Sequence, residues 1–135
     1  MKHLTLDLFE RIVDTFHEQT RNNLKLLGHV TPEECRNYIG YYGFHGGLFW
    51  SEQKGKICGV ATAHPRKKNF DWEWEEPNGI WTTHCVWADN KHALRELITD
   101  FLKTRPVHEL YAWRRKNPVI LNQKKLERIL TYGWK

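Results

Sequence analysis

The chain has 135 residues, of which 40% are hydrophobic and 27% charged, and its net charge is +5. This length fits one folded unit, so we expect a single domain over residues 1–135, and no apolar run reaches the roughly 18 residues that a membrane span needs. The three cysteines (Cys35, Cys58 and Cys85) form no C-x-x-C pair, and the histidines show no zinc spacing. This favours free thiols, no metal centre and a cytoplasmic location.

Two helices are predicted first. One begins after Thr5, a plausible N-cap, and its apolar residues recur at helical spacing: Leu6, Phe9, Ile12, Val13 and Phe16. The second begins after Thr31, with Pro32 at its first position and Glu34 three residues after the cap, which predicts a capping box. We expect this second helix to end near Gly43.

The pattern then changes to strands. Segments 47–51 and 57–63 are short and β-rich, and Gly55 between them predicts an antiparallel hairpin with positive φ at that glycine. Residues 66–78 are charged and aromatic, which indicates an exposed connection and a candidate protein-docking edge. The strongest strand is 79–88. Strict alternation predicts one face with Trp81, Thr83, Cys85 and Trp87, and another with Ile80, Thr82, His84 and Val86.

Asp89 and Asn90 cap a third predicted helix, which reaches about Thr104 and carries an amphipathic apolar stripe: Leu94, Leu97, Ile98, Phe101 and Leu102. A strand at 107–113 and a last helix at 122–132 follow. The strand–helix–strand unit implies one parallel pair with a right-handed crossover. The predicted class is α+β, a mixed sheet with an antiparallel hairpin, this parallel crossover and flanking helices.

Positive charge gathers at the end of the chain. Between Pro106 and Lys135 there are seven basic residues and two acidic ones. Such a bias favours an anionic partner, such as nucleic acid, phosphate or an acidic protein. A solvated helix face is the alternative.

The order of elements from residue 47 to 135 resembles the GNAT superfamily of N-acyltransferases. The closing segment NQKKLERILTYGW also places Asn122, Gly133 and Trp134 at the spacing common in closing helices of that family. The resemblance implies transfer of an acyl group from a thioester, acetyl-CoA or an acyl carrier protein, to an amine. The acceptor is then a small amine or a protein.

The same resemblance implies a donor site along the third strand and the start of the helix that follows it. The pantetheine arm of the donor would pair with the backbone of Val86, Trp87 and Ala88, and its phosphates would lie near Lys91 and His92. Asn122 of the closing helix is also assigned to cofactor binding.

Two residues are candidates for catalysis. His84 is suited to act as general base, because imidazole titrates near neutral pH and the family places such a group on a strand facing the acceptor. The family's tyrosine acid aligns with Ile129, and the nearest hydroxyl is Tyr132. A core histidine is the alternative for His84. Cys85, adjacent on the strand and expected to point to the opposite face, is an acyl-accepting nucleophile only as a thiolate, and otherwise a small buried hydrophobe.

The segment VWADNKHA departs from the family, because it has no glycine where a phosphate-binding loop is expected, and Asp89 adds negative charge. Two subgroups of the family show a similar loss: toxin-activating acyltransferases, which lack the glycine loop and use carrier proteins, and small phage-encoded GNAT-like proteins, including internal virion proteins, whose active site is eroded. The chain is most similar to the second. This similarity implies an alternative, a catalytically inactive GNAT fold with a protein partner in a virion or an accessory role. A small basic nucleic-acid-binding protein is a further alternative.

Overall fold

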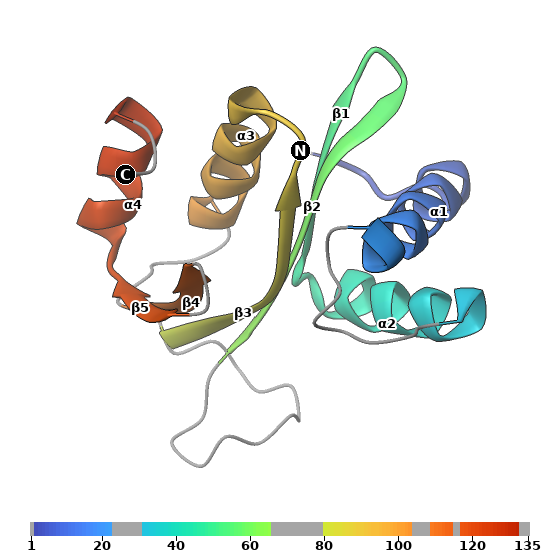
Figure 1. The fold of residues 1–135 in the computed structure, drawn as a ribbon, viewed down its shortest axis with the longest axis horizontal. Helices are drawn as coiled ribbons and strands as arrows, with labels where there is room; N and C mark the ends of the chain where they lie inside the picture. Colours follow the sequence, from blue (N-terminus) through green and yellow to red (C-terminus); the bar gives the residue numbers. More distant parts are fainter. Residues whose placement is uncertain (1, 23–30, 66–79, 104–108, 115–116, 133–135) are drawn as a thin grey trace.

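The computed structural model describes residues 2–22, 31–65, 80–103, 109–114 and 117–132. This part of the chain forms a five-stranded mixed sheet in the order β1-β2-β3-β4-β5. The strands are β1 (Leu48–Gln53), β2 (Lys56–Pro65), β3 (Ile80–Ala88), β4 (Glu109–Arg114) and β5 (Asn117–Leu121). The helices are α1 (Leu6–Asn22), α2 (Pro32–His45), α3 (Lys91–Leu102) and α4 (Gln123–Tyr132). Helices α1 and α2 cover one face, and α3 and α4 the other (Figure 1).

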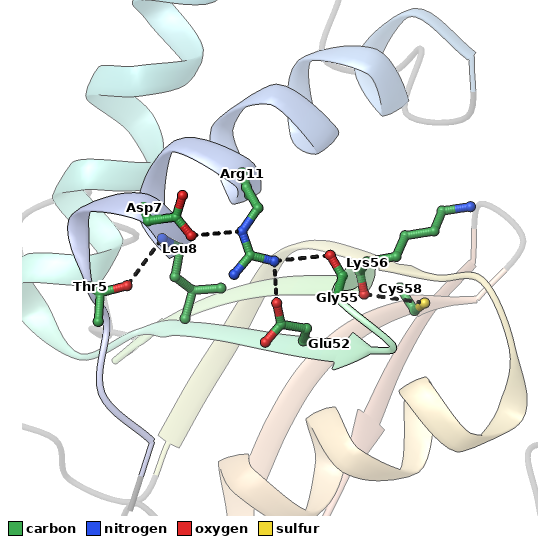
Figure 2. Close-up of polar contacts among 8 residues, drawn as sticks. All are labelled: Thr5, Asp7, Leu8, Arg11, Glu52, Gly55, Lys56 and Cys58. Carbon is green, nitrogen blue, oxygen red and sulfur yellow. Dashed lines mark hydrogen bonds and ion pairs between the residues drawn. The ribbon is translucent and has the colours of Figure 1, made fainter.

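Helix α1 begins where the sequence predicts and is fixed to the β1–β2 hairpin. The Thr5 hydroxyl accepts a backbone N–H of the first turn at 3.1 Å. Further along α1, the Arg11 guanidinium donates to the carbonyl oxygen of Gly55 at 3.1 Å, and it also pairs with Asp7 and Glu52 (Figure 2). One arginine thus connects the helix to both sides of the hairpin turn.

The predicted capping box of α2 is confirmed. The Thr31 hydroxyl accepts the N–H of Glu34 at 3.1 Å, and the Glu34 carboxylate accepts the N–H of Thr31 at 3.3 Å. The helix continues two residues past the predicted end, to His45. Gly46 then ends it with a φ of 80°, a left-handed conformation that glycine adopts without strain.

The hairpin turn is tighter than predicted. Only Lys54 and Gly55 separate β1 from β2, and both have positive φ, 52° and 78°. A two-residue turn with this geometry matches the twist of the strands that it joins. The positive φ at Gly55 is confirmed, whereas that at Lys54 gave no sequence signal, because a lysine rarely adopts it.

Strands β3 and β4 are parallel neighbours bridged by α3, as predicted. Their ladder is short, however, running only from the Ile80–Glu109 pair to the Thr82–Tyr111 pair. Beyond Thr82, β3 continues to Ala88 with β2 on one side and, within the described residues, no strand on the other. The two strands visibly diverge from that point (Figure 1). This leaves the β4-facing edge of β3 open.

The sequence-based order of elements was wrong in omitting β5. Residues 117–121 pair antiparallel with β4 and form the edge of the sheet. The segment is only five residues long and contains Pro118, which lacks a backbone N–H and is tolerated on an edge strand. Because the segment is so short and contains a proline, its sequence pattern does not predict a strand.

The strict alternation predicted for β3 was also wrong. Two consecutive residues of β2, Thr62 and Ala63, pair with Cys85 and Thr83, so that His84 is an extra residue in β3. Such a β-bulge shifts the side-chain alternation by one position. The side chains of Cys85 and Trp87, after the bulge, therefore lie on the face opposite to Trp81, whereas strict alternation predicts all three on one face.

The odd-numbered side chains of β3 enter different cores before and after the bulge. Before the bulge, Trp81 packs edge-on against Phe101 of α3, with ring centroids 5.3 Å apart. After the bulge, Cys85 and Trp87 belong to the core under α1 and α2. One strand thus joins both layers of helices to the sheet.

Helix α3 packs closely on β2 through its apolar stripe, as predicted. Leu97 is 3% exposed, and Phe101 and Ala93 are also buried. A Cβ placed on Gly59 of β2 would lie 3.2 Å from Leu97 Cδ1 and 3.4 Å from the Cβ of Ala93. The glycine therefore permits the close approach of the helix to the strand.

Replacing Leu97 with alanine removes a fully buried side chain and leaves a cavity, so we expect a loss of about 2–5 kcal/mol in the free energy of unfolding. Denaturant unfolding measures it. The matched control is Arg95→Ala on the exposed side of the same helix, expected to change stability by no more than about 0.5 kcal/mol. Equal effects of the two substitutions would contradict the packing described.

Candidate functional site

A buried polar cluster lies between α2 and the sheet at the β3 bulge. It consists of Tyr38, Thr62, His84 and Cys85, and we refer to it as the Tyr38 cluster. The Tyr38 hydroxyl forms hydrogen bonds with Nδ1 of His84 and, at 2.7 Å, with Oγ1 of Thr62. The backbone N–H of Cys85 donates to the same Thr62 oxygen at 3.1 Å. One helix and two strands thus hold the His84 ring.

A second hydroxyl–imidazole pair lies one helical turn further along α2. The Tyr42 hydroxyl forms a hydrogen bond of 3.0 Å with Nδ1 of His64, at the end of β2. The Tyr42 ring also stacks on the His84 ring, with centroids 6.3 Å apart and planes 15° apart. The two tyrosines, four residues apart on α2, therefore contact both buried histidines.

Burial determines the charge state of these groups. It lowers the pKa of His84 below the ordinary 6.5, and it lowers the pKa of His64, with a smaller contribution from the neighbouring His84. Burial also raises the pKa of the Tyr38 hydroxyl and that of the Cys85 thiol. At neutral pH the imidazoles are uncharged and able to accept a proton, whereas the thiol keeps its proton.

His84 and Cys85 do not point to opposite faces of the sheet, as strict alternation predicts. Because of the bulge, both lie on the α2 side, and Cys85 Sγ is 3.9 Å from His84 Nδ1. Cys85 is 5% exposed, and burial raises the pKa of its thiol more than the hydrogen bonds with Tyr38 and Thr62 lower it. These features favour the interpretation of Cys85 as a small buried hydrophobe.

An apolar cavity of about 310 Å³ lies on the opposite face of the sheet, along the open edge of β3. Thr83 and Val86 of β3 form one wall. The other walls come from α3, β5 and α4, through residues such as Leu94, Ile98, Leu121 and Leu126. The Tyr38 cluster and the cavity therefore lie on opposite sides of the same stretch of β3.

The predicted donor-site residues are brought together only in part. Val86 is 44% exposed and lines the cavity, whereas Ala88 packs against the core beneath α3. Trp87 turns to the other face, under α1 and α2. Lys91 and His92 are both exposed in the first turn of α3, immediately after the open edge.

The closing helix places its predicted residues elsewhere. Asn122 caps α4, because its side-chain oxygen accepts the N–H of Lys125 at 2.8 Å. Helices α3 and α4 run in opposite directions, so Asn122 lies at the other end of this helix pair from Lys91 (Figure 1). Tyr132 is the last residue of α4, but its side chain lies outside the described part, as do Gly133 and Trp134.

Sequence reasoning found His84 and Cys85 but missed the other two members of the Tyr38 cluster, Tyr38 and Thr62. The second pair, Tyr42 and His64, was not singled out either. The available signal was two hydroxyl groups at a spacing of four residues on a buried helix face, because buried hydroxyls require hydrogen-bond partners. Their partners, however, come from strands more than 20 residues away in the sequence.

Other predicted features are only partly described. In the basic end of the chain, Lys124, Lys125 and Arg128 are exposed on α4, whereas residues 115, 116 and 135 and the aromatic connection 66–78 lie outside the described residues. Among the residues that are described, no three His, Cys, Asp or Glu side chains gather as metal ligands would. None of the described helices is both long and apolar enough to cross a membrane.

Comparison with solved structures places the fold. A ribosomal-protein-alanine N-acetyltransferase from Brucella melitensis superimposes with a TM-score of 0.56 at 18% identity, over 82% of this chain and 71% of that one. A GNAT-family acetyltransferase from Streptococcus agalactiae gives the same TM-score at 12% identity, over 98% of this chain and 82% of that one. No family profile and no curated protein matches the sequence.

The fold is therefore the α+β fold of GNAT acetyltransferases, as the sequence predicts. At these identities the similarity concerns the fold alone.

The two buried histidines make stability depend on pH. Because the pKa of each is lower in the folded chain than in the unfolded chain, the unfolded chain binds more protons below about pH 6.5. We expect full stability above that pH and a progressive loss below it. Denaturant unfolding at a series of pH values measures this, and the His64→Gln variant should lose part of the dependence. An identical pH dependence in this variant would show that burial of His64 contributes nothing to it.

Proposed function

We propose that this protein transfers an acyl group from a thioester to an amine. One observation carries the proposal: the open edge of β3 runs between an apolar cavity on one face and a half-buried imidazole, His84, on the other. A thioester lying along that edge would have its arm in the cavity and its carbonyl near the base. The similarity to solved acetyltransferases supports the same conclusion.

The donor is coenzyme A or a carrier protein bearing the same pantetheine arm. Along the open edge, the backbone of Val86, Trp87 and Ala88 offers hydrogen-bonding groups to the amides of that arm. The apolar cavity beside them receives its hydrocarbon portion. Lys91, exposed at the end of the edge, supplies positive charge for phosphate, and the exposed His92 ring beside it offers a hydrogen bond. Asn122 stays a predicted contact at the far end of the helix pair.

His84 acts as the general base. The acceptor amine is mostly ammonium at neutral pH, so a proton must leave before its nitrogen can attack. His84 takes that proton, the amine nitrogen bonds to the thioester carbonyl carbon, and the carbon–sulfur bond breaks. The departing thiolate takes a proton from Tyr132, the predicted donor, and the second proton of the attacking nitrogen restores the Tyr132 hydroxyl as the amide forms. Tyr38 positions the imidazole through its hydrogen bond to Nδ1.

Replacing His84 with glutamine should reduce the rate of acyl transfer roughly 10²–10⁴-fold, the range expected for loss of a general base. The assay uses acetyl-CoA and acetyl-pantetheine with a panel of amines. In the wild type, the pH profile should show an ascending limb below pH 6.5, because burial lowers the pKa of His84.

Wild-type turnover that is unaffected by His84→Gln would refute the role of this residue. No turnover with any donor would refute the proposed function itself and would favour a catalytically inactive GNAT fold with a virion or accessory role.

Tyr38→Phe removes the hydroxyl that holds His84 while leaving the ring in place. We expect kcat to fall and the ascending limb of the pH profile to move, with KM for the amine little changed, because the imidazole is displaced rather than the substrate. Tyr42→Phe is the matched control: it lies on the same helix, but its hydroxyl bonds His64. Equal effects of the two substitutions on the pH profile would contradict the positioning role.

A further inference from the structure

The N-terminus of α3 is not built to hold a pyrophosphate. The Asn90 side-chain oxygen already accepts the N–H of Ala93 at 2.8 Å, and the Asn90 and Gln53 amides exchange hydrogen bonds of 3.3 and 3.4 Å. The backbone N–H of Asp89 donates to Cys58 at 2.8 Å, which fixes an exposed carboxylate just before the helix. A phosphate here would have to displace a cap and approach a like charge.

Positive charge lies instead along the outer faces of α3 and α4. Five basic side chains on these helices are exposed, and none forms an ion pair with another described residue: Lys91, Arg95, Lys124, Lys125 and Arg128. The two acidic residues of α3, Glu96 and Asp100, both pair with Lys2, at 2.9 and 2.7 Å. The acidic side of α3 is thus neutralised within the chain, and its basic side is left to solvent.

This charge flanks the apolar cavity. Lys91 and Arg95 each precede a cavity-lining residue of α3, Leu94 and Ile98, by three positions, so they lie beside these residues on the helix surface. On α4, Leu126 also lines the cavity, Lys125 is its neighbour in the sequence, and Lys124 and Arg128 lie on the opposite, exposed face of the helix. Single charges dispersed over two helices match an extended anionic surface better than one compact diphosphate.

From these observations we infer that the acyl donor is presented by an acidic carrier protein, which docks on the exposed basic side chains of α3 and α4 and extends its acylated pantetheine arm into the cavity. The inference rests on the proposed function. Charge complementarity with the acidic carrier supplies the attraction, and the arm makes the contacts along the open edge of β3. Free coenzyme A has no acidic protein surface to dock on the basic side chains, and its diphosphate would approach the like charge of Asp89.

The test compares three donors at equal concentration: an acidic acyl carrier protein loaded with an acetyl group, acetyl-CoA and acetyl-pantetheine. We expect kcat/KM for the loaded carrier to exceed that for acetyl-CoA roughly tenfold or more at low salt, and the advantage to shrink as salt screens the charges. In the Arg95→Glu/Lys125→Glu variant, the ratio of kcat/KM for the carrier to that for acetyl-pantetheine should fall roughly tenfold. Lys56→Glu, an exposed lysine on β2, is the matched control and should leave that ratio unchanged.

The outcomes separate this inference from the proposed function. Acetyl-CoA used as well as the loaded carrier would overturn the inference and leave acyl transfer standing. Absence of turnover with all three donors would overturn both. A third outcome is that a short DNA duplex binds in a salt-sensitive way, the double substitution abolishes this binding, and the carrier does not bind. This would also overturn the inference, because nucleic acid would then be the partner of the basic surface.

Discussion

The register shift between β2 and β3 determines the arrangement of the site. Because His84 is an extra residue opposite the Thr62–Ala63 pair, Trp81 before it faces α3, whereas Cys85 and Trp87 after it face α1 and α2. A regular ladder that keeps Trp81 on α3 would place Cys85 and Trp87 on the α3 side as well, away from Tyr38 and His84. The bulge also falls next to Thr82, the last residue of β3 that pairs with β4. His84 and the start of the open edge are thus only two residues apart in β3.

Three hydrogen bonds keep the bulge in this geometry. The Thr62 hydroxyl bonds both the Cys85 backbone N–H and the Tyr38 hydroxyl, which in turn bonds His84. A buried polar group left without a partner costs roughly 1–3 kcal/mol, so each member of the Tyr38 cluster depends on the others. The docking of α2 on the sheet therefore determines how the His84 ring is held.

Most of the architecture could be predicted from the sequence, because it depends on residues that lie close together in the chain. The capping box at Thr31, the apolar stripe around Leu97 and the parallel crossover each follow from residues close together in the chain, and the structure confirms all three. The missed features depend on pairing between distant segments. Neither β5, with its proline on an edge, nor the bulge at His84 leaves a periodic signal. Most of the candidate site follows from that bulge, so sequence reasoning found His84 without finding the side chains that hold it.

The most direct test of this account is an NMR titration of the His84 imidazole in the wild type, Tyr38→Phe and Tyr42→Phe. In the wild type we expect His84 to titrate below pH 6.5, because partial burial lowers its pKa. We also expect that removing the Tyr38 hydroxyl changes the pKa of His84 more than removing the Tyr42 hydroxyl does, because only the former bonds Nδ1. A His84 that titrates near 6.5 and responds to neither substitution would contradict this account, since the imidazole would then lie outside the Tyr38 cluster.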